Sequence, residues 1–291
     1  MRLTSRSGGW PLHGWLGLGL IIVFWTFNWS LSGLRSHWCF FPLWLGYCLT
    51  VDALVRVRKG DSLLTRSPAA YVGLFIASIP GWWLFELINS RTQNWCYEGA
   101  QRFTDLQYFV LASVSFSTVM PAVFGTAELM STFNWVKRTR RGPLILPRPT
   151  TLLTFLFSGC LMLVLLLLWP RYFFPLVWLS IFFIVEPLNA WLGNRSLIQY
   201  TARGDWRPVW ALWAGCLTCG FFWEMWNFYS YPKWVYHVPF VDFCRIFEMP
   251  LLGYGGYLAF SLELFAVYHL MVGLLRLARA QDYLQIAPGA R

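Results

Sequence analysis

Charged side chains are scarce in this sequence: Asp, Glu, Lys and Arg make up only 12% of its 291 residues. Soluble domains carry about 25% charged residues, so the composition excludes a soluble domain of useful size. Apolar side chains are abundant instead, at 57% hydrophobic and 20% aromatic residues, with a mean hydropathy of +0.49. Because about 20 apolar residues suffice for a membrane-spanning helix, the chain is predicted to be an all-α, polytopic membrane protein.

Other absences narrow the function. The sequence has no Gly-rich phosphate loop, no His-rich box and no Asp-rich diphosphate motif, so we expect neither a cofactor nor a metal. The seven cysteines show no paired framework, and Cys216-x-x-Cys219 lies within a predicted span, where packing is favoured over redox or metal chemistry. The net charge of +10 is attributed to membrane topology and not to a nucleic-acid partner.

Apolar runs predict about eight spans. They cover approximately residues 15–34, 38–55, 69–89, 106–131, 151–169, 173–192, 209–229 and 250–275. With both termini in the cytoplasm, most of the 23 Lys and Arg fall on the inside, as the positive-inside rule requires. We therefore expect an integral plasma-membrane protein with both termini cytoplasmic.

One motif occurs twice, and each copy has Glu-x-x-Asn at the end of a span and Trp-x-Tyr in the following loop. Its residues are Glu86, Asn89, Trp95 and Tyr97 in the first copy and Glu224, Asn227, Trp234 and Tyr236 in the second. Further pairs recur at nearly the same offset: Asp52 with Glu186, Ser62-Leu63 with Ser196-Leu197, and Glu128 with Glu263. Residues 1–140 and 141–291 are thus predicted to be two four-helix repeats. Because four is even, the repeats are parallel.

Acidic residues inside spans are the candidate functional groups. An acid at the bilayer centre costs about 2.5–3.5 kcal/mol, so such side chains should face the bundle interior or a cavity. The candidate catalytic acids are Glu86 and Glu224 near the outer ends of their spans, Glu248 at the mouth of the last span, and Glu263. The remaining acids within spans, expected to form a proton relay or hold helices together, are Asp52, Glu128 and Glu186.

Aromatic residues surround the outer acids. The candidate substrate-binding residues are Asn89, Trp95, Tyr97, Trp223, Trp226, Asn227, Trp234 and Tyr236. Trp at span ends also forms interfacial belts, and the two asparagines are expected to hydrogen-bond the outer carboxyls or cap their helices. A carboxyl in a dry aromatic pocket can act as a general acid, and aromatic faces stabilise a developing cation. This chemistry suits protonation of an alkene or epoxide in a lipid-borne substrate. The opposing carboxylate would take the proton back, with His237 and His269 as alternative bases, although a lone histidine more often has a structural role.

The order of these features resembles the membrane lycopene cyclase family. The resemblance lies in Glu224, Asn227, Trp234, Tyr236 and the acid–proline segment Phe247 to Pro250, together with the first copy of the motif. It implies tandem helical units and an isomerase of carotenoid biosynthesis that cyclises an isoprenoid. The chain departs from the family because Glu248 stands alone before Pro250, where the family has proline followed by two adjacent acids. The repeat here also has four spans, against about three in the family.

Two other functions stay open. A proton-coupled membrane transporter would use the two layers of acids as its relay. Transporters often have broken helices at matched positions, whereas only Pro121 and the Gly253 to Gly256 cluster interrupt the spans here. A non-catalytic assembly subunit would use the acids only to join helices. If the protein is an enzyme, its expected partner is a membrane lipid or an isoprenoid substrate.

Overall fold

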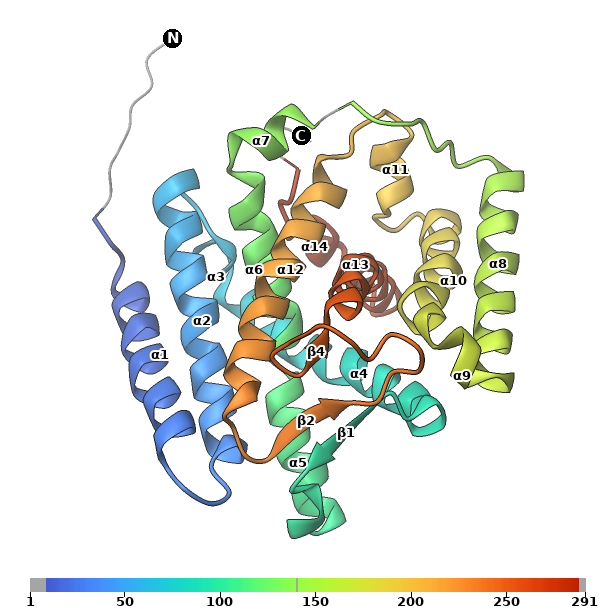
Figure 1. Ribbon diagram of the computed structural model, residues 1–291. Coiled ribbons are helices and arrows are strands. Elements are labelled where there is room, and N and C mark those ends of the chain that lie inside the picture. Colours follow the sequence, from blue (N-terminus) through green and yellow to red (C-terminus); the bar gives the residue numbers. More distant parts are fainter. Residues whose placement is uncertain (1–8, 140, 288–291) are drawn as a thin grey trace.

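The computed structural model describes residues 9–139 and 141–287, and nearly all of its secondary structure is helical (Figure 1). The long helices are α1 (Leu12–Ser30), α2 (Ser36–Lys59), α4 (Pro68–Thr92), α5 (Asp105–Phe116), α6 (Val119–Ser131), α8 (Pro149–Leu168), α10 (Val177–Leu192), α12 (Arg207–Phe228) and α13 (Gly256–Leu274). Short helices are α3 (Leu63–Arg66), α7 (Asn134–Arg138), α9 (Pro170–Phe173), α11 (Leu197–Thr201) and α14 (Ala278–Gln281), with 3-10 turns η1 (Ala100–Arg102), η2 (Phe174–Leu176) and η3 (Leu251–Gly255). The strands are β1 (Trp95–Glu98), β2 (Lys233–Tyr236), β3 (Arg245–Ile246) and β4 (Met249–Pro250).

Membrane-spanning segments agree with the predicted class. Seven segments of the described chain are long and apolar enough to cross a membrane by length and composition. The predicted span at residues 209–229 is α12, which has 22 residues but is not among these seven. Its Glu224, its tryptophans and its glycines lower its hydropathy. The chain is therefore an all-α, multi-pass membrane protein, with α12 as a further long helix of the same bundle.

Helix α12 lies inside the bundle, where it packs against α6 and α13. A Cβ atom added at Gly215 would lie 2.6 Å from the backbone nitrogen of Ala127 on α6. This close backbone approach is typical of small residues between membrane helices. Because α12 contacts protein rather than lipid over much of its surface, it tolerates the polar residues that lower its hydropathy.

The outer helices have the opposite character. Helix α1 packs on α2 and α8 packs on α10, and the large apolar side chains on their other faces are exposed. Examples are Leu16 and Ile22 on α1, and Phe157 and Leu161 on α8. In a multi-pass protein these faces meet the acyl chains, which replace water as the solvent for apolar side chains.

A two-stranded ribbon joins the two halves of the chain. Strands β1 and β2 pair antiparallel, with Trp95 opposite Tyr236 and Tyr97 opposite Trp234 (Figure 1). The two Trp-x-Tyr motifs therefore face each other in the register that a two-fold axis through the ribbon would produce. The sequence predicted both motifs as loop residues and not as paired strands.

The acids Asp52, Glu128, Glu186 and Glu263, called the inner acids below, differ in their partners. The carboxylate of Asp52 accepts a hydrogen bond from the backbone N–H of Leu64 at 2.9 Å, and Glu186 accepts one from Ile198 at 2.7 Å. In both cases the donor lies 12 residues after the acid in the sequence. The second pair differs, because Glu128 forms ion pairs with Arg66 and Lys59. Its counterpart Glu263 accepts hydrogen bonds from the N–H groups of Ile181 and Phe182 on α10 instead.

Candidate functional site

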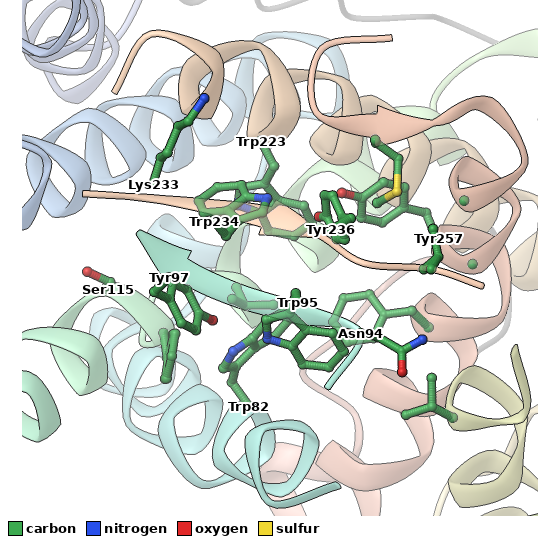
Figure 2. Close-up of a pocket in the computed structure, with 18 of the residues that line it drawn as sticks. Trp82, Asn94, Trp95, Tyr97, Ser115, Trp223, Lys233, Trp234, Tyr236 and Tyr257 are labelled. Carbon is green, nitrogen blue, oxygen red and sulfur yellow. The ribbon is translucent and has the colours of Figure 1, made fainter. Parts of the chain in front are cut away.

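An aromatic cavity of about 470 Å³ lies beside the β1–β2 ribbon (Figure 2). Both halves of the chain contribute to its wall. The large side chains that line it include Trp82 of α4, Trp95 of β1, Trp178 of α10, Trp223 of α12, Trp234 of β2 and Tyr257 of α13. Ligand sites are typically concave, mostly apolar and about 300–1,000 Å³ in volume. The cavity is thus large enough for a small molecule or one end of a lipid.

The carboxyl group of Glu86 lies behind this wall. Its Oε1 accepts hydrogen bonds from the Tyr97 hydroxyl at 2.5 Å, from Nε1 of Trp82 at 2.8 Å and from Nε1 of Trp95 at 3.0 Å. Trp82 precedes Glu86 by one turn of α4, and β1 brings the other two donors to the same oxygen. All three donors line the cavity, so Glu86 is connected to it through their side chains.

The second copy of the motif places Glu224 in a similar position. Its side chain is fully buried, and its Oε1 accepts hydrogen bonds from the hydroxyls of Tyr236 at 2.8 Å and Tyr257 at 2.6 Å. Its Oε2 has no hydrogen-bond partner among the described residues. Both tyrosines line the cavity. Glu86 and Glu224 therefore reach one cavity from opposite halves of the chain, each through the tyrosine of its own motif.

The loop tyrosines remain protonated. Burial, together with the neighbouring carboxyl, raises the pKa of Tyr97 and of Tyr236 well above the usual value for a phenol. Both hydroxyls therefore act as hydrogen-bond donors to the glutamates at physiological pH. The wall of the cavity therefore contains neutral phenol groups, and each of these phenols is hydrogen-bonded to the carboxyl group of Glu86 or Glu224 behind it.

The two motif asparagines do not line the cavity, and neither side chain forms a hydrogen bond with an acid of the described chain. Nδ2 of Asn89 donates to the Trp95 carbonyl at 2.8 Å, and its Oδ1 accepts from the backbone N–H of Asn94 at 2.9 Å. Asn227 binds both the carbonyl and the N–H of Trp234, at 2.7 Å and 3.0 Å. The asparagines therefore hold the ribbon strands against the helix ends and position the Trp and Tyr side chains.

Three other predicted residues lie outside the cavity wall. Trp226 does not line it and packs against Trp25 and Trp44. Glu248 pairs with Lys233, which does line the cavity, at 2.5 Å. Glu263 is bonded to the backbone of α10, as described above.

The inner acids Asp52, Glu128 and Glu186 also lie away from the cavity, each with its own partners. Of the alternative bases, His237 is exposed and lies 3.5 Å from the Cys96 sulfur. His269 is buried on α13, 3.0 Å from the carbonyl oxygen of Phe265. Neither histidine lines the cavity.

Sequence reasoning missed several wall residues, chiefly Trp178 and Tyr257. Neither belongs to a repeated motif, and each is one aromatic among many in its span. Their role depends on how α10 and α13 rotate against α4 and α12, which the apolar pattern of a membrane helix does not specify. No group of three or more His, Cys, Asp or Glu side chains among the described residues is placed to hold a metal ion.

The fold and the site together define a multi-pass helical membrane protein with an aromatic cavity and two glutamates behind its wall, of which Glu86 is half-buried and Glu224 is fully buried. Comparison of the chain with protein-family models, with curated proteins and with solved structures finds no match in any of the three.

Proposed function

We propose that the protein is an integral membrane enzyme that isomerises or cyclises an isoprenoid, or another unsaturated lipid, by acid–base chemistry. One observation carries the proposal: Glu86 and Glu224 reach the same aromatic cavity through Tyr97 and Tyr236. Such a reaction adds a proton at one carbon of the substrate and removes a proton from another carbon. It therefore needs one acid and one base that reach the same cavity. The resemblance of the repeated motif to membrane lycopene cyclases points to the same class of reaction.

The hydrogen bonds assign different roles to the two acids. Glu224 has an unpartnered, fully buried Oε2, which fits a carboxyl that carries its proton there. Three donors converge on Oε1 of Glu86, which fits a carboxylate, because donors stabilise the charged form. Tyr236 or Tyr257 would turn its hydroxyl toward the cavity and give its proton to the substrate, and the Glu224 carboxyl would replace that proton on the tyrosine oxygen. On the other side, Tyr97 would take a proton from the substrate on its oxygen and pass its own hydroxyl proton to Glu86.

The reaction then balances without an external reagent. The proton adds to one carbon of a substrate alkene, and the alkene's electron pair forms the new C–H bond. The carbocation left on the neighbouring carbon is attacked by a second alkene, which forms the ring bond. Loss of a proton from an adjacent carbon to the Glu86 side restores an alkene, so substrate and product have the same composition.

The aromatic wall suits this intermediate. A cation over the face of Trp or Tyr gains about 0.5–2 kcal/mol per ring, more when water is excluded. Tryptophans from both halves, such as Trp95 and Trp223, line the cavity. A volume of about 470 Å³ accommodates one end of a long isoprenoid, with the remainder of the chain in the bilayer.

We further propose that the protein lies in the plasma membrane with both termini in the cytoplasm. The basic segments around α7, α11 and α14 gather at one end of the bundle, opposite the β1–β2 ribbon (Figure 1). Under the positive-inside rule that end faces the cytoplasm. The aromatic cavity then opens near the outer face.

The test is product formation by the full-length protein in a bacterial host that accumulates linear polyisoprenoids. Mass spectrometry of lipid extracts should show a new compound with the mass of its precursor and a different retention time. Glu224→Gln should abolish the compound, and Glu98→Gln should not, because Glu98 is an exposed residue of β1. Unchanged lipids in a strain with verified membrane expression would refute the proposal.

A proton-coupled transporter is the second candidate, and the inner acids favour it. Glu186 and Glu263 are buried, and each has one carboxyl oxygen without a partner among the described residues. Such groups can carry protons through a membrane protein. Substrate-driven acidification of proteoliposomes that is lost in Glu186→Gln, with host lipids unchanged, would establish the transporter in place of the enzyme.

A further inference from the structure

A second cavity, of about 570 Å³, lies at the end of the bundle opposite the ribbon. Residues of α2, α6, α7, α11, α13 and α14 line it, together with Arg195 from the segment between α10 and α11. Four cationic side chains line it: Arg58, Lys59, Lys137 and Arg195. The proposed reaction uses none of these residues.

Cations gather on the inner side of any multi-pass protein, and they also stabilise helix C-termini, so their number alone carries no argument. Their convergence does. Arg58 and Lys59 come from α2, Lys137 from α7, and Arg195 from the segment between α10 and α11. Three separate parts of the chain thus direct positive charge into one hollow.

Some of this charge is already matched. Glu128 is fully buried and pairs with both Lys59, at 3.4 Å, and Arg66, at 3.0 Å. Asp61 lies 3.9 Å from Lys59 and 3.4 Å from Arg66. These two cations and two carboxylates compensate one another. Arg195 forms an ion pair with Asp282, which also lines the cavity.

Two cations have no carboxylate partner among the described residues. The guanidinium of Arg58 donates to the Thr132 hydroxyl at 2.6 Å and lies over the Phe133 ring, 4.2 Å from its centroid. The ammonium group of Lys137 makes no hydrogen bond and no ion pair within residues 9–139 and 141–287. Counted over the described residues, the cavity therefore carries about two uncompensated positive charges. The Tyr200 hydroxyl, which also lines the cavity, adds a neutral donor, whereas the donor groups of Thr132 and Gln281 are already bonded to backbone carbonyls.

We infer that this cavity binds a phosphate group, either the headgroup of an anionic lipid or a free phosphate. Two unmatched cations suit a phosphate monoester, which carries up to two negative charges and accepts charge-assisted hydrogen bonds from arginine and lysine. The apolar residues Phe265, Leu284 and Ala287 on the same wall give a lipid-borne phosphate additional contact. The site is independent of the aromatic cavity and of its proposed chemistry.

The chain provides a matched pair of variants for the test. Arg58→Gln/Lys137→Gln removes the two unmatched cations. Arg56→Gln/Arg138→Gln removes two exposed cations from the same helices, α2 and α7, that do not line the cavity. Both double variants lower the net charge equally, so a difference between them measures the cavity and not the general surface potential.

The full-length protein is placed in phosphatidylcholine nanodiscs and examined in two arms. The first arm measures the midpoint of thermal unfolding against inorganic phosphate. The second exchanges phosphatidic acid into the nanodisc and counts retained lipid by native mass spectrometry. The wild type and the control variant should bind in at least one arm, and the cavity variant should bind at least tenfold more weakly in that arm.

The arm that responds identifies the source of the phosphate. Binding of phosphatidic acid alone assigns a lipid headgroup, and binding of inorganic phosphate assigns a free phosphate. Equal binding by the two double variants would overturn the site, because the effect would then be surface electrostatics. The absence of binding by the wild type in both arms would also overturn it.

Discussion

Tyr236 donates its hydroxyl proton to Oε1 of Glu224 at 2.8 Å, and Tyr97 makes the equivalent bond to Glu86 in the other half of the chain. The tyrosine, and not the carboxyl, borders the aromatic cavity in each case. A proton that moves between the carboxyl and a molecule in the cavity must therefore pass through the tyrosine hydroxyl.

Tyr236→Phe should lower product formation by about 100-fold, since general acid catalysis typically contributes 10²–10⁴-fold. The residual rate would come from Tyr257, which donates to the same oxygen. The rate of product formation in isolated membranes is the measurement. Tyr229→Phe is the control, because Tyr229 is exposed and does not line the cavity. An unchanged rate in Tyr236→Phe would remove that hydroxyl from the proton path.

The two glutamates should fail in different ways when each is replaced by glutamine. Glu224→Gln leaves Tyr236 and Tyr257 without the acid that would replace their protons, so the precursor should accumulate unchanged. Glu86→Gln leaves the cation without its base, so a fraction of the substrate should be released as an alcohol after capture by water. Mass spectrometry separates the two, because the alcohol is heavier than the precursor by one water molecule. Identical products from both variants would contradict the assignment of acid and base.

The ribbon should depend on the two asparagines. Asn227→Ala removes both hydrogen bonds to the backbone of Trp234 and leaves buried polar groups unpaired, at a cost of about 1–3 kcal/mol. The thermal unfolding midpoint should fall, and protease should cut the segment after α12 more quickly. Asn134→Ala is the comparison, since Asn134 is exposed on α7. Equal protease resistance in the two variants would mean that the asparagine does not hold the strand.

Helix packing can be tested at glycine. Gly215→Ala would place its Cβ 2.6 Å from the Ala127 nitrogen, so α12 and α6 would have to separate, and stability should fall. Gly19→Ala has no atom within 4 Å of the added carbon, and alanine favours helix by about 0.5–1 kcal/mol over glycine. The Gly19 variant should therefore be neutral or slightly stabilised in a thermal unfolding experiment. A Gly215 variant as stable as the wild type would contradict the close approach.

The sequence predicted the class of fold because composition alone distinguishes lipid from water as the solvent. Span positions followed from the lengths of the apolar runs, and Glu86 and Glu224 from their repeated motif. The pairing of Trp95 with Tyr236 could not be predicted, because two loops far apart in the chain show no β signal longer than four residues. Tyr257 and Trp178 were missed because helix rotation within a membrane bundle leaves little trace in uniformly apolar sequence.

The asparagines show a different limit. Their position one turn after each acid was read correctly from the helical period, but proximity along a helix does not say which neighbour a side chain will bond. The structure directs Asn89 to the backbone around Trp95 and not to Glu86. A polar side chain at the end of a span can satisfy loop backbone as readily as a carboxyl. Only the path of the loop distinguishes the two.

The β1–β2 ribbon also makes each half of the chain incomplete without the other. A lone repeat would expose the four-residue edge of one strand and half of an aromatic wall. Two separately expressed fragments, 1–140 and 141–291, should therefore recognise each other in the bilayer and rebuild the ribbon. A single repeat paired with its own copy could form the same ribbon, with identical Trp-x-Tyr strands on both sides. In such a homodimer the two motif glutamates would have identical surroundings, unlike Glu86 with its three donors and Glu224 with its two tyrosines here.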